Sequence, residues 1–216
     1  MERMICLIAG YLFGLIQSGY FYGKVHKIDI RNYGSGNSGT TNALRVMGAK
    51  AGAVVFFGDF LKSLLPCLLI RVLFRSQPEM IYLLILYMGF GVILGHNYPF
   101  YLNFKGGKGI AATAGLIVAV DLRLTLLCLA AFVLIVAVTR YVSLGSLVVA
   151  TILFVWLFLF GKTGAYGLDP RTLPEFYIVA ALISGRRSGA TGQISDGLSV
   201  AERIKFPLDL EKNKMR

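Results

Sequence analysis

The chain has 216 residues, of which 56% are hydrophobic and only 15% are charged, and its formal net charge is +11. Ordinary soluble domains are about 25% charged, so this composition excludes a soluble protein and favours one polytopic helical membrane domain. Basic residues of membrane proteins collect in cytoplasmic loops near anionic lipids, so the net charge does not indicate nucleic-acid binding. The isolated Cys6, Cys67 and Cys128 and the two histidines form no disulfide or metal-ligand pattern, and we expect no cofactor.

Apolar runs long enough to cross a bilayer recur along most of the sequence. The predicted fold class is therefore all-α, a polytopic integral membrane helical bundle with about seven transmembrane helices. Asp121 and Arg123 interrupt the run at 110–139, which we interpret as two helices. The spans are expected at residues 4–22, 51–74, 79–98, 110–139 (two helices), 142–160 and 173–185. We expect residues 1–185 to form the membrane domain and residues 186–216 a polar, basic C-terminal tail.

With seven crossings, alternate loops fall on the same side of the membrane, and one side collects most of the lysine and arginine residues. By the positive-inside tendency that side is cytoplasmic, which places the N-terminus outside. The loops after the first and third spans and the turn at Arg140 then share the cytoplasmic face. The sequence shows no clear internal repeat, so it gives no support to a transporter built from inverted repeats.

The first of two glycine-rich loops runs from Gly34 to Arg45 and contains no carboxylate. Glycine lets backbone N–H groups approach an anion, hydroxyl and amide side chains add donors, and arginine supplies positive charge. The glycines also fit a GxGxxG dinucleotide fingerprint, but they lie between membrane spans and not in a βαβ unit. The alternative to a phosphate-binding loop is a flexible connector. The candidate residues are Gly34, Ser35, Gly36, Asn37, Gly39, Thr41, Asn42 and Arg45.

The second glycine-rich loop runs from Gly95 to Gly109 and places Lys105 and Lys108 on either side of a glycine pair. Two cations beside mobile backbone suit a phosphate, although lysines near tyrosines are also typical membrane-interface anchors. His96 either orients a substrate or moves a proton, or it is a hydrogen-bonded structural residue. The candidate residues are His96, Asn97, Lys105, Gly106, Gly107 and Lys108.

Two smaller groups of polar residues complete the candidates. Asp59 and Lys62 lie three residues apart on one face of an apolar span, and we expect an ion pair that shapes the bundle. Arg140 and Ser143 close a span on the loop side, where the alternatives are a membrane anchor and a helix N-cap.

The sequence contains no serine–histidine–carboxylate triad, so any chemistry depends on positioning, on charge stabilisation or on a base from the substrate. The loops predict action on phosphorylated molecules at the membrane surface.

These motifs together make the chain resemble the bacterial membrane glycerol-3-phosphate acyltransferases that use acyl phosphate as donor, the PlsY family. The family's first motif, GSGN-x-G-x-TN-x-x-R, is matched from Gly34 to Arg45. The second, GHN followed by F-KGGKG, is matched from Gly95 to Gly109, and the third, R-Y-x-S-x-x-S, from Arg140 to Ser146. The similarity extends over about residues 9–183.

The resemblance implies a seven-helix enzyme that transfers a fatty acyl group from acyl phosphate to the sn-1 hydroxyl of glycerol 3-phosphate, giving lysophosphatidic acid and phosphate. Family members are described as forming no covalent acyl-enzyme, and the donor's own phosphate has been proposed as the base. By analogy, Arg45, Lys105 and Ser143 hold glycerol 3-phosphate, and the first glycine loop cradles the phosphate of acyl phosphate. The resemblance also implies a bacterial inner-membrane location, contact with membrane lipids and a functional link to a phosphate acyltransferase that supplies the donor.

The site residues expected from the motifs and the resemblance fall into two groups. The expected catalytic residues are Ser35, Asn37, His96 and Ser143. The expected substrate-binding residues are Gly34, Gly36, Gly39, Thr41, Asn42, Arg45, Asn97, Lys105, Gly106, Gly107, Lys108 and Arg140.

The chain departs from the family pattern in three places. Gln17 lies where the first helix of the family often has proline, and Ser38 replaces a frequent proline in the first motif. The family's last helix ends in an H-R-x-N-I-x-R-L segment whose histidine and asparagine help to form the site. This chain reads GRRSGATG at residues 185–192 and has no histidine after His96. Either it is a divergent paralogue or its C-terminus is altered, and we hypothesise that its activity is impaired or lost.

Two other functions stay open. A membrane anion or phosphate transporter also needs basic loops and apolar helices, and a non-catalytic scaffold descended from the enzyme would explain the altered tail. Product formation separates the acyltransferase from both alternatives, and substrate flux into proteoliposomes identifies the transporter.

Overall fold

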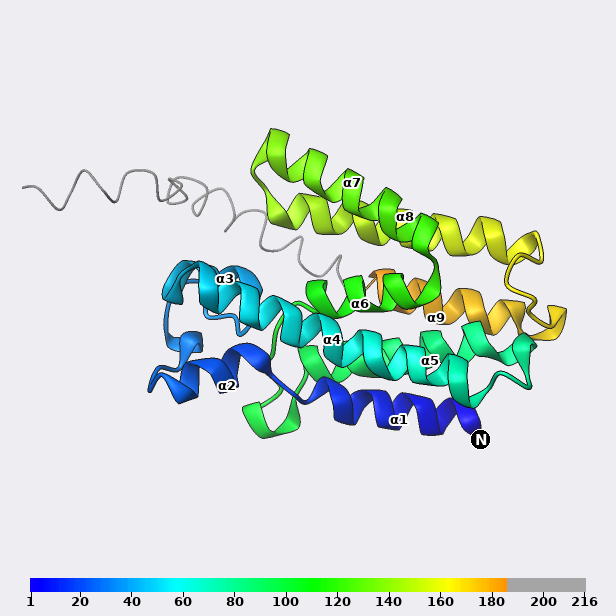
Figure 1. The fold of residues 1–216 in the computed structure, drawn as a ribbon, viewed down its shortest axis with the longest axis horizontal. Helices are drawn as coiled ribbons and strands as arrows, with labels where there is room; N and C mark the ends of the chain where they lie inside the picture. The colour runs from blue at the N-terminus through cyan, green and yellow to red at the C-terminus, as the bar shows by residue number, and fades with distance from the viewer. Residues whose placement is uncertain (186–216) are drawn as a thin grey trace, which may run out of the picture.

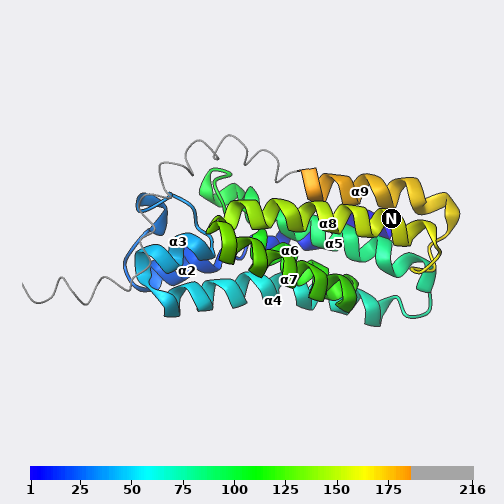
Figure 2. The same cartoon turned by 90° about the horizontal axis from the view of Figure 1, so that it is seen from above.

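The computed structural model describes residues 1–185, which form helices and contain no β-strand. The α-helices are α1 (Glu2–Gly14), α2 (Ser18–Val25), α3 (Thr40–Met47), α4 (Ala49–Leu73), α5 (Pro78–Asn97), α6 (Ile110–Val120), α7 (Leu122–Thr139), α8 (Val142–Lys162) and α9 (Leu173–Gly185). The 3-10 turns are η1 (Ile30–Asn32), η2 (Phe100–Leu102) and η3 (Pro170–Thr172). Most helices run roughly along one long axis (Figure 1), and α8 packs between α7 and α9 (Figure 2).

Five helical segments of this part of the chain are long and apolar enough to cross a membrane. They are Glu2–Val25, Ala49–Leu73, Pro78–Leu102, Leu122–Thr139 and Val142–Lys162. Large apolar side chains remain exposed along them, as expected of a surface that faces lipid. The predicted all-helical integral membrane fold is confirmed. The number of crossings stays a prediction, because α6 has 11 residues and α9 has 13.

Glycines let α1 and α5 pack with their backbones in direct contact. Gly10 and Gly14 on α1 face Gly91 and Gly95 on α5, and a Cβ atom at any of the four would overlap a carbonyl oxygen of the opposite helix. Small residues four positions apart allow this close approach between membrane helices. The contact sets the end of α5, which carries the start of the second glycine loop, beside the end of α1.

The prediction of one continuous helix over residues 4–22 is wrong, because the helix is interrupted between the end of α1 at Gly14 and the start of α2 at Ser18. Side chains from other segments satisfy the carbonyl groups at the break. The hydroxyl of Tyr101 donates to the carbonyl oxygen of Leu15 at 2.6 Å. The ammonium of Lys62 donates to the carbonyl oxygen of Ile16 at 2.6 Å. These bonds replace the intrahelical bonds that a continuous helix would make.

The short helix α6 ends against an arginine from α4. The guanidinium of Arg71 donates to the carbonyl oxygen of Ala119 at 2.6 and 3.0 Å and to that of Val120 at 2.9 Å. Asp121 then caps α7 by accepting from the backbone N–H of Arg123 at 2.7 Å. The predicted division of residues 110–139 at Asp121 is confirmed, and the break is stabilised from both sides.

We expect Arg71→Met to lower the free energy of unfolding by about 2 kcal/mol, because two helix-end carbonyls lose charged hydrogen-bond donors while the side-chain stem is kept. The measurement is denaturant unfolding of the purified protein in detergent. Arg75→Met, at an exposed arginine just beyond α4, is the control. Equal stability of the two variants would contradict the capping role of Arg71.

Candidate functional site

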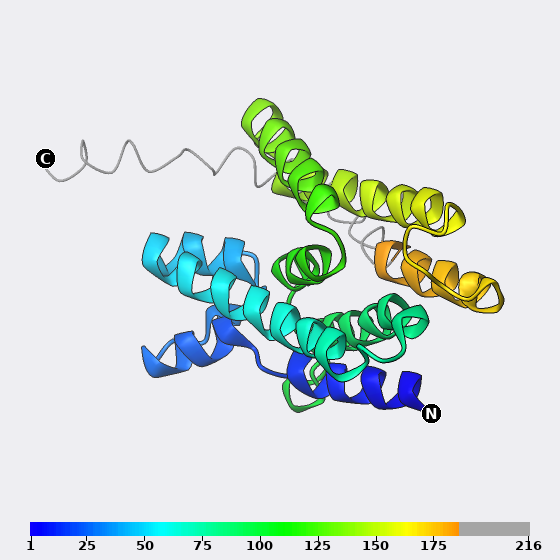
Figure 3. The same ribbon diagram turned by 45° about the vertical axis from the view of Figure 1, so that its right-hand side comes forward.

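The two glycine-rich loops lie toward the end of the bundle opposite the N-terminus (Figures 1 and 3). The first loop connects α2 through η1 to the start of α3, and the second connects α5 through η2 to the start of α6. Each loop therefore leads into a helix N-terminus, where the first N–H groups have no acceptor within the helix. Backbone donors from two helices are thus available at this end of the bundle.

Asn42 determines the shape of the first loop. Its amide nitrogen donates to the carbonyl oxygens of Ile30 at 2.9 Å and Tyr33 at 3.1 Å, and its Oδ1 accepts from the backbone N–H of Ser35 at 2.9 Å. The backbone of Gly34 is left-handed at φ +60°, and a Cβ atom there would overlap Oδ1 of Asn42. Asn42 is buried, so the structure gives this predicted substrate-binding residue a role inside the loop.

The other predicted residues of the first loop lie closer to solvent. Ser35, Thr41 and Arg45 are exposed, as are the glycines at positions 34 and 36. Asn37 is partly buried, and its Oδ1 accepts from the backbone N–H of Gly39 at 2.8 Å. The exposed hydroxyls and guanidinium are the groups that this loop presents to a ligand.

The second loop folds back over the end of α5. The N–H groups of Gly106 and Gly107 donate to the carbonyl oxygens of Asn97 at 3.1 Å and His96 at 3.0 Å. A Cβ atom at Gly106 would overlap the His96 carbonyl oxygen, and one at Gly107 would overlap the imidazole Nε2. The glycine pair is therefore required for close packing on His96. Oδ1 of Asn97 is buried and has no hydrogen-bond partner among the described residues.

His96 belongs to a buried polar cluster inside the bundle. The ammonium of Lys62 lies 2.9 Å from Oδ1 of Asp59 and 2.7 Å from Nδ1 of His96. The hydroxyl of Ser18 donates to Oδ1 of Asp59 at 3.0 Å. The predicted Asp59–Lys62 ion pair is confirmed, and the imidazole is 2% exposed. This geometry favours the alternative in which His96 is a hydrogen-bonded structural residue, because its buried side chain packs against the glycine pair of the second loop.

The cations of the two loops form no ion pair with a carboxylate of residues 1–185. Arg45, Lys105 and Lys108 are exposed, and no ion pair found within residues 1–185 involves them. Partial burial of the Lys108 ammonium removes hydrating water and lowers its pKa, and the positive charge of Arg45 lowers this pKa further. Two cations from separate loops therefore lie near enough to sense each other, an arrangement that an anion between them would stabilise.

The acidic residue nearest in sequence to the first loop is already paired. Asp29 accepts from the Arg31 guanidinium at 2.8 Å, and this hydrogen bonding lowers the pKa of the Asp29 carboxyl. Its charge is thereby neutralised locally. Within residues 1–185 no group of three or more histidine, cysteine and carboxylate side chains is placed to hold a metal ion.

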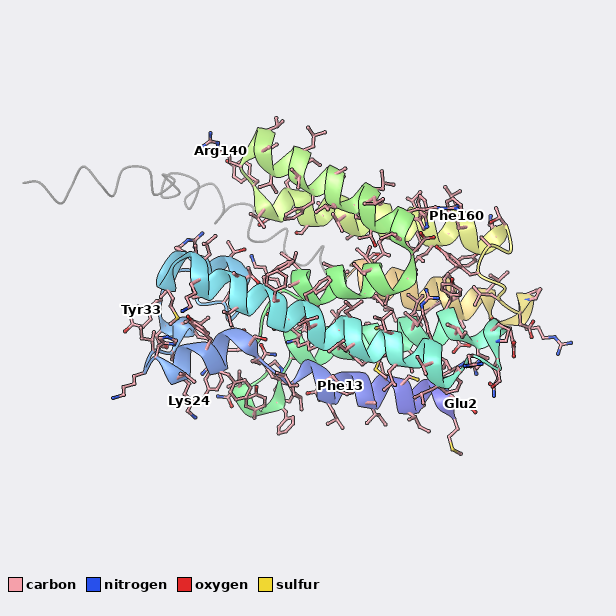
Figure 4. The ribbon with its side chains drawn as sticks, in the orientation of Figure 1. Glu2, Phe13, Lys24, Tyr33, Arg140 and Phe160 are labelled. Atoms are coloured by element: carbon pink, nitrogen blue, oxygen red, sulfur yellow. The ribbon has the colours of Figure 1, made fainter. Side chains whose placement is uncertain are left out.

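Arg140 lies at the same end of the bundle but on the turn between α7 and α8, apart from the first loop (Figures 3 and 4), and Ser143 follows at the start of α8. Arg140 ends α7 in a left-handed conformation at φ +61° and is exposed. Ser143 is also exposed, inside the first turn of α8, whose N-cap is Tyr141. The N-cap alternative for Ser143 is therefore wrong. The structure brings together the two glycine loops and leaves this third motif beside them.

Sequence reasoning missed the role of Gln17 and Ser38, which it treated only as tolerated departures from a family pattern. Both are 1% exposed, and Gln17 links Ser38 of the first loop to His96 at the start of the second. The available signal was a lone amide in an otherwise apolar run, since buried amides need hydrogen-bond partners.

This fold and site define an α-helical integral membrane protein with basic, glycine-rich loops gathered toward one end. A profile of the family described as glycerol-3-phosphate acyltransferase matches residues 4–194. A curated protein of that name from Thermoanaerobacter pseudethanolicus is 45% identical over 148 residues, which are 68% of this chain and 72% of the relative. Another from Aquifex aeolicus is 37% identical over 161 residues, which are 74% of this chain and 82% of the relative. The chain belongs to the glycerol-3-phosphate acyltransferase family.

Solved structures agree with this assignment. The crystal structure of PlsY, an integral membrane glycerol 3-phosphate acyltransferase, in its glycerol 3-phosphate form is 33% identical in sequence. The match covers 91% of this chain and 94% of that chain with a TM-score of 0.73. The lysophosphatidic acid form of PlsY is 32% identical, with 91% and 93% coverage and a TM-score of 0.72.

Proposed function

We propose that this protein transfers a fatty acyl group from acyl phosphate to the sn-1 hydroxyl of glycerol 3-phosphate. The observation that carries the proposal is the pair of exposed cations Arg45 and Lys108, one from each glycine loop of a membrane bundle, which form no ion pair within residues 1–185. Two phosphorylated substrates need positive charge and backbone donors, and an acyl chain needs an apolar bundle. The glycerol 3-phosphate and lysophosphatidic acid forms of the related PlsY structures supply the substrate and product by analogy.

The reaction is proposed to proceed without a covalent intermediate. The sn-1 hydroxyl oxygen attacks the acyl carbonyl carbon, the bond from that carbon to the phosphate oxygen breaks, and the hydroxyl proton goes to the departing phosphate. The cations stabilise the charge that develops on the phosphate, and the loops hold the two substrates in reacting distance. We assign phosphate binding to Arg45, Lys105 and Lys108.

Other roles of the predicted site follow from position. Ser35 and Asn37 act on the phosphate held by the first loop, and Arg140 and Ser143 act from the α7–α8 turn at the same end. We place these loops on the cytoplasmic face of a bacterial inner membrane, where a phosphate acyltransferase supplies acyl phosphate. The positive charge of the loops favours that face.

The test is acyl transfer by the purified protein in lipid, with labelled glycerol 3-phosphate and palmitoyl phosphate. The parent is compared with an Arg45→Ala, Lys105→Ala variant. Lysophosphatidic acid formed by the parent and lost in the variant supports the proposal. Absence of product from a well-folded parent, together with flux of labelled phosphate into proteoliposomes, would identify a transporter instead.

The altered tail favours a second candidate, an impaired or repurposed member of the family. Residues 186–216 lie outside the described residues, and the sequence there lacks the histidine and asparagine of the family's last helix. A chimera that carries a family-type tail tests this candidate in the same assay. A gain of activity supports impairment by the tail, and no gain removes the hypothesis.

The lowered pKa of Lys108 predicts that glycerol 3-phosphate binds less tightly as the pH rises from neutral towards 10.5, the usual pKa of lysine. A bound phosphate favours the protonated ammonium, so binding is strongest below the Lys108 pKa and weakens as the pH passes through it. Calorimetric titration in lipid nanodiscs measures the Kd at each pH. Lys108→Arg keeps the charge and is expected to flatten the profile. A parent profile as flat as that of this variant would contradict the prediction.

A further inference from the structure

A buried hydrogen bond joins the break between α1 and α2 to the first glycine loop. The hydroxyl of Ser38 donates to Oε1 of Gln17 at 3.1 Å, and both residues are 1% exposed. The loop backbone is equally close at this point, because a Cβ atom at Gly19 would overlap the carbonyl oxygen of Ser38. The first loop is therefore packed directly onto the start of α2.

The same amide of Gln17 reaches the second loop. Its Nε2 donates to the carbonyl oxygen of His96 at 2.9 Å and lies 3.3 Å from that of Gly95. The His96 carbonyl oxygen also accepts the N–H of Gly107 at 3.0 Å. A continuous chain of hydrogen bonds thus runs from Ser38 through Gln17 and the end of α5 to the glycine pair next to Lys108.

We propose that Gln17 is a positioning residue that fixes the separation of the two glycine loops, so that Arg45 and Lys108 act on one phosphate. This inference rests on the proposed function of the site. Arg45 follows Ser38 by seven residues on α3, and Lys108 directly follows Gly107. The positive charge of Arg45 also contributes to the lowered pKa of Lys108, in agreement with this arrangement.

The chemistry of the two positions supports this role. A buried amide is costly unless it is hydrogen-bonded, and Gln17 meets this requirement through the Ser38 hydroxyl and the carbonyl oxygens of Gly14, Gly95 and His96. Proline, which the family often has at positions 17 and 38, could make neither bond because its side chain has no polar group. This chain therefore holds the loops with a paired amide and hydroxyl.

Hydrogen exchange of the full-length protein in nanodiscs tests the coupling without using the reaction. Gln17→Met keeps the side-chain volume and removes both bonds, and it is expected to raise amide exchange in residues 34–45 and 95–109 together. Ser38→Ala removes only the bond to the first loop, and it is expected to raise exchange in both segments by a smaller factor. Thr125→Ala, which deletes a part-buried hydroxyl on α7, is the matched control and should change neither segment. If Gln17→Met or Ser38→Ala raised amide exchange in residues 34–45 alone, the inference would be overturned.

Binding of glycerol 3-phosphate measures the consequence for the site. Gln17→Met is expected to raise the Kd by about tenfold and Ser38→Ala by a smaller factor, because Gln17→Met removes more of the buried hydrogen bonds that position the loops. Ser38→Ala should add little in the Gln17→Met background, because the bond it breaks is already gone. An unchanged Kd in both single variants, or additive effects in the double variant, overturns the inference. A parent that binds no glycerol 3-phosphate while both loops still respond together in exchange overturns the proposed function and leaves the coupling supported.

Discussion

Arg45→Ala is expected to raise the Kd of the protein for glycerol 3-phosphate by about 100-fold while leaving thermal stability unchanged. Arg45 is exposed on the last turn of α3, and no ion pair found within residues 1–185 involves it. On the proposed function, its removal therefore costs a charged hydrogen bond to phosphate and breaks no ion pair of residues 1–185. Isothermal titration in nanodiscs gives the Kd, and the acyl-transfer assay gives the corresponding loss of kcat/KM.

Lys50→Ala is the matched control for Arg45→Ala. Lys50 is an exposed cation five residues further along, at the start of α4, so its removal changes the net charge equally near the same loop. We expect at most a few-fold change, which higher salt reduces further. If Lys50→Ala weakened binding as much as Arg45→Ala, the loss of affinity would come from the lower net positive charge near the loop. The proposal that Arg45 binds the phosphate directly would then be wrong.

Gly91→Leu is expected to lower the free energy of unfolding by about 3 kcal/mol or more and to reduce the yield of folded protein. A Cβ atom at this position already overlaps the carbonyl oxygen of Leu7, so a larger side chain must push α1 and α5 apart. Separation of these helices also moves the His96 carbonyl oxygen at the end of α5 away from the Gln17 amide, so the second glycine loop is expected to be displaced as well. Thermal unfolding in detergent and elution as a single species measure the effect.

Ala137→Leu introduces the same side chain at an exposed position of α7, and it controls for an added apolar side chain. We expect no loss of stability there. Comparable losses in the two variants would contradict the role of glycine in the α1–α5 contact.

Much of the fold follows from the sequence because membrane helices need long apolar runs. The expected spans at 51–74, 79–98 and 142–160 agree with α4, α5 and α8 to within a few residues. The division at Asp121 was also predictable, since Asp121 and Arg123 interrupt an apolar run of 30 residues, which is too long for one span. The break between α1 and α2 was not, because residues 4–22 contain no charged residue and the donors that satisfy its carbonyls come from distant segments.

The candidate site shows the same contrast between what the sequence predicts and what the tertiary structure adds. Sequence by itself determined the membrane class, the family motifs and the residues that carry positive charge, because charge and glycine spacing are local properties. It did not separate exposed residues from buried residues that hold the loop together, as Ser35 and Asn42 show within one motif. The tertiary structure alone showed that Asn42 and His96 are buried and hydrogen-bonded and that Gln17 links the two loops. Those roles depend on hydrogen bonds between residues up to 79 positions apart. A local sequence pattern does not indicate which distant group forms a hydrogen bond with a buried polar side chain.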